Sequence, residues 1–261
     1  MNNKIRFELS FKNISQLDNK LNFCKLNNIK NINIPCKGLI KKDLFNSTIK
    51  YISKNYNEFN VTYHYSLYHQ YSKNKEKSYQ DFLDFVKSSQ TNKNYEILLV
   101  SGSNKKKNFD SVDVLAYLKK EKNLKVKLGI AYNPYLKKYY NISSERERFE
   151  KKISTGLINS IWFQYGTDIK VLQNEVTYLK NVAKEEKLNL FGSLFIPSKQ
   201  FIARFKFRPW KEVYISEKCL YALENFFDFT NDLVSFYKKN NITPVSYTHL
   251  RAHETRHDLV C

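Results

Sequence analysis

The sequence has 261 residues, of which 42% are hydrophobic and 15% aromatic, so it can build a sizeable core and is not typical of a disordered chain. Its formal net charge is +19, from 44 Lys and Arg against 25 Asp and Glu, which permits an anionic partner. No apolar stretch approaches the roughly 20 residues that a membrane-spanning helix needs, so we expect no such helix.

Short apolar runs alternate along the chain with longer segments whose apolar residues recur at helical spacing. The runs predict strands and the longer segments predict amphipathic helices. Tyr95–Val100 is the clearest strand, because a continuous apolar run is typical of burial on both faces. We expect strands at Lys4–Ser10, Asn31–Pro35, Phe59–Tyr65, Tyr95–Val100, Leu124–Tyr132, Ser160–Gln164 and Leu188–Ile196, and helices at Ile14–Leu26, Lys42–Lys54, Lys77–Ser89, Ser111–Lys120 (after Asp110 as N-cap), Ser144–Ser154, Ile169–Lys184, Ser198–Lys206 and Ser216–Lys239.

Strict alternation of strand and helix predicts a parallel sheet with crossover helices. A doubly wound open sheet and a closed (β/α)8 TIM barrel both fit this order. Seven strand-then-helix units of about 30 residues favour the barrel. In a barrel, functional groups lie at the carboxyl ends of the strands, which is where we look for a site.

The end of the chain differs in composition from the rest. Residues 1–244 are rich in Lys and Asn, whereas Val245–Cys261 has neither, yet holds His249, His253 and His257. Back-translation of this segment spells the end of a common transposon-type library adapter. We therefore expect residues 1–244 to form a single TIM-barrel domain and residues 245–261 to be a non-native tail, whose histidines bind no metal.

This interpretation has a consequence for the eighth strand. Asn241–Pro244 is where strand 8 should begin, so we expect the natural strand 8 and helix 8 to be missing. We also expect the β-prone stretch Val245–Thr248 to enter the barrel as a false eighth strand, and the chain to be poorly stable.

Cysteine spacing and charge leave several partners open. Cys24, Cys36 and Cys219 match neither a zinc site nor a disulfide framework, which indicates free thiols in a reducing, cytoplasmic location, and we expect no signal peptide. The positive charge fits three explanations: compositional drift towards Lys, a phosphorylated small ligand, or nucleic acid.

Three polar residues stand on strands that are otherwise apolar. Glu8 is a candidate general acid, because burial raises the pKa of a carboxyl group, although a structural glutamate fits equally. His64 and Gln164 are candidate ligand contacts, with a structural role as the alternative for each. The loop Ser101–Asn104, followed by Lys105–Lys107, could hold a phosphate through backbone amides or be a solvated basic turn.

Taken together, the strand ends resemble those of the methylenetetrahydrofolate reductase family. The likeness lies in Phe7-Glu8 on the first strand and His64-Tyr65-Ser66 at the end of the third. It continues in Ala131-Tyr132-Asn133-Pro134 after the fifth, Lys152-Ile-Ser-Thr-Gly156, and Gln164-Tyr165 after the sixth. It runs from about residue 4 to 244.

The resemblance implies a TIM barrel that transfers hydride from NAD(P)H through FAD to a folate one-carbon carrier. It implies that Glu8 is the general acid, that Gln164 contacts the folate, and that His64, Tyr132 and Lys152 contact the flavin. The family's Arg-Gly-Asp at the end of the fourth strand is replaced by Ser101, Gly102 and Ser103, which puts FAD binding in doubt.

Three hypotheses follow. The first is a methylenetetrahydrofolate reductase-like oxidoreductase of one-carbon and methionine metabolism, with the roles above. The second is a non-redox TIM barrel that binds a phosphorylated or polyglutamylated metabolite through Lys105–Lys107 and Lys199. The third and weakest is an RNA-binding basic protein, whose association would depend strongly on salt.

Overall fold

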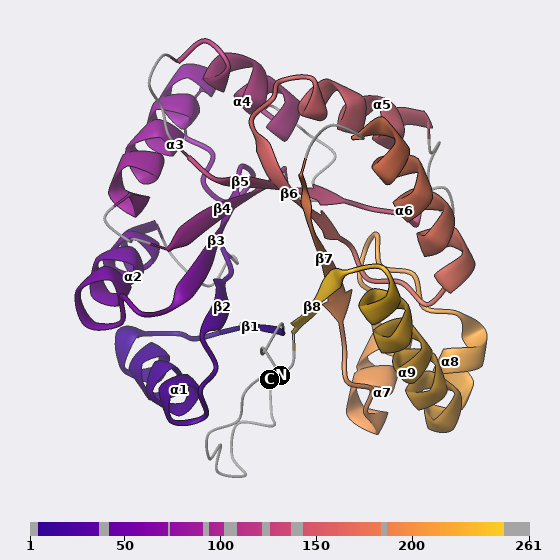
Figure 1. Ribbon diagram of the computed structural model, residues 1–261. Helices are drawn as coiled ribbons and strands as arrows, with labels where there is room; N and C mark the ends of the chain where they lie inside the picture. Colours follow the sequence, from indigo (N-terminus) through magenta and orange to yellow (C-terminus); the bar gives the residue numbers. More distant parts are fainter. Residues whose placement is uncertain are drawn as a thin grey trace.

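Eight parallel strands form a closed barrel in chain order (Figure 1). The computed structural model describes residues 5–36, 42–72, 74–90, 94–101, 109–121, 126–136, 143–183 and 187–247. The strands are β1 (Arg6–Glu8), β2 (Asn31–Ile34), β3 (Asn60–Ser66), β4 (Tyr95–Val100), β5 (Leu128–Tyr132), β6 (Ile158–Phe163), β7 (Asn189–Leu194) and β8 (Ile242–Ser246). This confirms the TIM-barrel prediction.

The helices surround the barrel as an outer ring (Figure 1). They are α1 (Ile14–Leu26), α2 (Lys42–Asn55), α3 (Lys75–Ser89), α4 (Ser111–Leu118), α5 (Ser143–Ile153), α6 (Ile169–Val182), α7 (Lys199–Phe207), α8 (Glu217–Tyr221) and α9 (Leu223–Lys239). The expected single helix Ser216–Lys239 is divided, because Ala222 has extended backbone angles (φ −130°, ψ 126°). Cys219 in α8 and Phe226 in α9, on either side of the break, are both buried.

Residues alternate between the two faces of each strand, as a pleated strand requires. One face packs against the helices and forms the main apolar core, which includes Tyr63, Ile97 and Phe163. The other face fills the barrel, where Leu98, Trp162 and Val245 form a small separate cluster. The barrel interior is therefore filled by side chains, and space for a ligand remains at its ends.

The amino-terminal end of the barrel is closed by Arg6, which is buried. Its guanidinium donates to Asn33 Oδ1 (2.8 Å) and to Thr62 Oγ1 (2.8 Å). It also donates to the backbone oxygens of Ile32 (2.8 Å) and Asn60 (2.9 Å). One side chain thus joins the first three strands.

The eighth strand closes the barrel between β7 and β1. Arg6 pairs with Val245 and Phe7 with Ser246, while Ser193 and Leu194 pair with the same two residues from the other side. Val245 and Ser246 thus take part in strand 8, as expected. Residues 248–261, with all three tail histidines, lie outside the described residues, and the foreign origin of the tail stays a prediction.

Three further observations concern chemistry elsewhere in the part of the chain that the structure describes. Cys24, Cys36 and Cys219 are buried free thiols. Within the described ranges, no cluster of three or more His, Cys, Asp or Glu side chains could hold a metal ion. None of the helices described above is long and apolar enough to cross a membrane.

Candidate functional site

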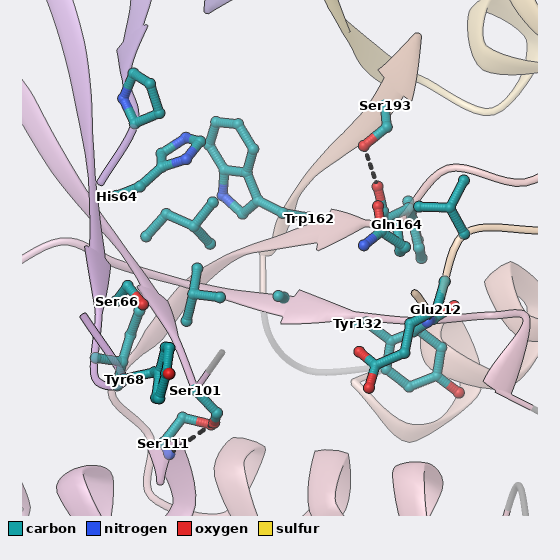
Figure 2. Close-up of a pocket in the computed structure, with 18 of the residues that line it drawn as sticks. His64, Ser66, Tyr68, Ser101, Ser111, Tyr132, Trp162, Gln164, Ser193 and Glu212 are labelled. Atoms are coloured by element: carbon teal, nitrogen blue, oxygen red, sulfur yellow. Dashed lines mark hydrogen bonds between the residues drawn. The ribbon is translucent and has the colours of Figure 1, made fainter. Parts of the chain in front are cut away.

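A cavity of about 800 Å³ opens at the carboxyl ends of the strands, where the barrel fold predicts a site (Figure 2). Every strand of the barrel contributes to its wall, directly or through the residues just after it. The lining includes Glu8, Cys36, His64, Ser66, Ser101, Tyr132, Lys152, Trp162, Gln164, Ser193, Phe195 and Tyr247.

Trp162 forms the floor of the cavity. Its ring stacks on Phe191, with centroids 4.1 Å apart, and meets the His64 ring edge-on at 6.1 Å. The indole Nε1 donates to Ser160 Oγ at 2.8 Å. Gly129 on the neighbouring strand leaves room for this arrangement, because a Cβ there would lie 2.5 Å from both Nε1 and Ser160 Oγ. The indole is therefore held in one orientation.

A buried polar network supports this floor from below. Ser160 Oγ donates to Glu96 Oε1 at 2.5 Å. Burial raises the pKa of Glu96, while the Ser160 hydrogen bond and the charge of Arg6 oppose the rise. Burial lowers the pKa of Arg6 to about 10, against the attraction of Glu96. The Arg6 guanidinium lies 5.8 Å from the Trp162 ring centroid, so the cation also supports the floor.

Glu8 and His64 lie together at one side of the floor. Glu8 is the last residue of β1 and is buried, and its Oε2 lies 3.8 Å from His64 Nδ1 on β3. Both side chains line the cavity. The structure therefore brings together two of the residues that the sequence singled out, on strands separated only by β2.

Gln164 lies on the far side of the floor, directly after β6 (Figure 2). Its Oε1 accepts from the backbone N–H of Tyr165 at 2.9 Å, which fixes the amide plane. Nearby Ser193 donates to the backbone oxygen of Phe163 at 2.7 Å. Hydrogen-bonding groups thus face the cavity from both sides of an aromatic floor.

Two other predicted contacts, Lys152 and Tyr132, both reach the cavity but differ in where their polar atoms bond. Lys152 on α5 is buried and lines the cavity. Tyr132 contributes to the wall, but its hydroxyl bonds to Glu175 on α6 at 2.5 Å and its ring packs edge-on against Phe149. Burial, reinforced by Glu175, raises the pKa of this phenol, so it stays a neutral donor.

Ser101 also lines the cavity, and its hydroxyl is engaged at the start of α4. Its Oγ lies 2.9 Å from Ser111 Oγ and accepts from the Ser111 N–H at 3.0 Å. Gly102, Ser103 and Lys105 lie outside the described residues. Lys199 begins α7, is exposed, and is not among the residues that line the cavity.

Glu145 and Arg148 of α5 form a charged part of the cavity wall, and Arg148 also reaches Asp110, the N-cap of α4. Arg148 Nη1 and Asp110 Oδ2 are 2.6 Å apart, and Arg148 Nε lies 3.8 Å from Glu145. Burial opposes ionisation of Asp110, but Arg148 and the N–H groups of Val112 and Asp113 outweigh it and lower the pKa of the carboxyl group. This wall is charge-balanced rather than an open cationic site.

Residues 208–216, between α7 and α8, form a rim segment at the cavity mouth. Trp210, Lys211, Glu212 and Val213 all line the cavity. The sequence shows these residues only as an unassigned basic stretch, and no motif indicates that they reach the site. The role of Trp162 as the floor was not predicted either. Trp162 and Gln164 are two residues apart on one strand and so face the same way, which was a usable signal.

No protein-family model matches the sequence, and neither does any curated protein. Among solved structures, active domain 2 of a thermostable chitinase from Pyrococcus furiosus, complexed with chito-oligosaccharides, is 12% identical, with a TM-score of 0.55 over 94% of this chain and 83% of that one. An uncharacterized Clostridium thermocellum protein that binds two copies of 5-methyl-5,6,7,8-tetrahydrofolic acid is 11% identical, with a TM-score of 0.55 over 95% and 89%. These likenesses show the barrel fold alone.

Proposed function

We propose that the cavity binds the pterin ring of a reduced folate. The observation that carries the proposal is that Glu8 and Gln164 line one cavity, with Glu8 beside His64 on one side of Trp162 and Gln164 on the other (Figure 2). The pyrimidine half of a reduced pterin is flat and carries N–H donors along one edge, beside mixed donors and acceptors. The site offers a matching set of groups.

Each group has a defined part in this proposal. Trp162 bounds the bottom of the cavity, so the pterin rests on a residue that is 4% exposed and already stacked on Phe191. Glu8 accepts from the adjacent ring N–H and amino group, as a carboxylate can do with both oxygens. Gln164, whose side-chain amide both donates and accepts, bonds to the ring on the other side. A barrel with the same fold that binds 5-methyl-5,6,7,8-tetrahydrofolic acid supports this choice of ligand.

Flavin-dependent hydride transfer remains a prediction of the sequence resemblance. His64 and Lys152 line the cavity as that prediction requires. Tyr132 and Ser101 also line the cavity, and their hydroxyls bond to Glu175 and Ser111.

Calorimetric titration with 5-methyl-5,6,7,8-tetrahydrofolic acid tests the proposal. We expect binding to the unmodified chain, weakened roughly tenfold or more in Glu8→Gln, because a charged acceptor is lost. Glu58→Gln is the matched control. Glu58 lies just before β3, forms an ion pair with Lys25 and does not line the cavity.

Two results would decide against the proposal: no measurable binding to the unmodified chain, or equal binding by Glu8→Gln. Titration with FAD in the same buffer tests the redox alternative. Uptake of FAD with a visible absorbance band would support a flavoenzyme, and a colourless protein that takes up no FAD would exclude one.

A further inference from the structure

An aromatic wall, made of Phe195 and Trp210, stands towards the cavity mouth. Phe195 follows β7 two residues after Ser193, so it faces the same way but lies nearer the mouth. The Trp210 ring packs on Phe195 (5.4 Å between centroids), on Phe201 (5.4 Å) and on Phe205 (6.3 Å). The residue is nevertheless 45% exposed, so it is not enclosed by these three rings.

The rim segment that carries Trp210 is fastened to the ends of β5 and β6. Thr167 N–H donates to Tyr214 O at 3.0 Å, and Ser216 N–H donates to Thr167 Oγ1 at 2.6 Å. Asn133 Nδ2 donates to the backbone oxygen of Glu212 at 2.9 Å. Glu212 has a φ of +66°, which residues other than glycine rarely adopt, so these bonds hold the segment in a conformation it would otherwise avoid.

We propose that this wall is a second subsite of the cavity, which takes an aryl group attached to the heterocycle bound on Trp162. The inference rests on the proposed function. In a reduced folate the aryl group is the aminobenzoyl ring, which would stack against the exposed part of Trp210. Lys211, the next residue, lines the cavity and supplies a cation for the carboxylates beyond that ring.

Tyr68 offers a competing surface across the mouth. It follows β3, which lies opposite β7 in the barrel, and it is 48% exposed. Its ring packs on His69, which is itself exposed, at 5.0 Å. Trp210 is favoured because three aromatic side chains hold it in place, so stacking there costs little ordering. Tyr247 also stacks on Phe195, at 5.3 Å, but belongs to the expected tail.

The test combines truncation of the side chain with truncation of the ligand. Calorimetry measures the Kd of 5-methyl-5,6,7,8-tetrahydrofolic acid and of a tetrahydropterin without the aminobenzoyl group. We expect Trp210→Ala to weaken the folate roughly tenfold and to leave the tetrahydropterin unchanged. Phe207→Ala is the matched control, because Phe207 is a 91% exposed aromatic residue of α7 outside the cavity lining.

Trp210→Leu keeps an apolar contact with Phe195 but removes the flat ring, so it serves if Trp210→Ala unfolds. An equal loss for both ligands would mean that Trp210 only supports the rim, and would overturn the inference. So would a folate-specific loss in Tyr68→Ala but not in the Trp210 variants. If neither ligand binds the unmodified chain, both the subsite and the proposed function fail. If both ligands bind but the Trp210 variants lose them equally, only the subsite fails.

Discussion

Trp162 and Gly129 show how a site residue depends on its neighbour across the sheet. Gly129 pairs with Ser160 on β6, and its missing side chain is what gives the indole space beside Ser160. The alternation of side chains between the two faces of β5 explains the direction of the Tyr132 side chain. Ala131 faces the cavity, so the phenol of the next residue is directed to the helices and to Glu175. A motif at a strand end thus names candidate residues without deciding their direction.

We expect Gly129→Ala to weaken folate binding, because the added Cβ displaces Trp162 from its position. We also expect the variant to lose roughly 1–3 kcal/mol of stability. Gly192→Ala is the matched control. A Cβ there would also clash, but with Tyr237 on α9, away from the cavity. Calorimetry and thermal unfolding of both variants separate the effects. Equal folate affinity in the two would contradict the role of the floor.

The start of α4 shows an element whose boundary the sequence predicts well. Asp110 caps the helix, its Oδ1 accepting from Val112 N–H at 2.8 Å in a capping box with Asp113. The sequence indicates this cap because Asp directly precedes a run with helical spacing. The sequence does not predict the ion pair of Asp110 with Arg148, because Arg148 lies on α5, 38 positions further along the chain.

We expect Asp110→Asn to lower the free energy of unfolding at pH 7 by roughly 1 kcal/mol, since Asn keeps the cap but loses the charge that attracts Arg148. The pKa of Asp110 is lowered on folding from its ordinary value of 3.8. Its ionic contribution is therefore complete above that value and is lost as pH falls through the lower, folded pKa.

Urea unfolding at pH 7 and at stepwise lower pH measures this difference, which should shrink in acid. Asp228→Asn, at an exposed position on α9, is the control and should leave stability at pH 7 unchanged. A difference for Asp110→Asn that stays constant down to acid pH would show that the cap geometry, rather than the charge, was lost.

Arg6 and the polar groups that it bonds to close the amino-terminal end of the barrel, and we call this set the polar plug. Arg6 bonds to β2 and β3, and its guanidinium lies 5.7 Å from the Phe191 ring on β7, so one residue contacts strands around the circumference. Removing one partner of a buried charged network is costly, because the remaining groups stay buried without compensation.

We therefore expect Arg6→Met to destabilise the chain by roughly 3–5 kcal/mol and to lower its Tm by about 10 °C. Lys25→Met, which breaks an exposed pair with Glu58, should change stability by less than about 1 kcal/mol. Thermal unfolding followed by circular dichroism compares the two. A similar Tm for both variants would show that the plug contributes little to barrel closure.

The sequence by itself predicted the alternation of strands and helices, favoured a closed barrel over an open sheet, and indicated the end of the barrel where a site forms. These follow from local periodicity and from the handedness of strand–helix–strand units, which each segment carries on its own. It also placed Glu8, His64 and Gln164 at strand ends.

Only the tertiary structure decided which of these side chains share a cavity and what surrounds them. The Trp162 floor needs Gly129, Ser160 and Glu96 from three strands, and the rim segment reaches the cavity through bonds to Asn133 and Thr167. Such contacts join residues far apart in the chain, and their geometry is set by packing rather than by local pattern.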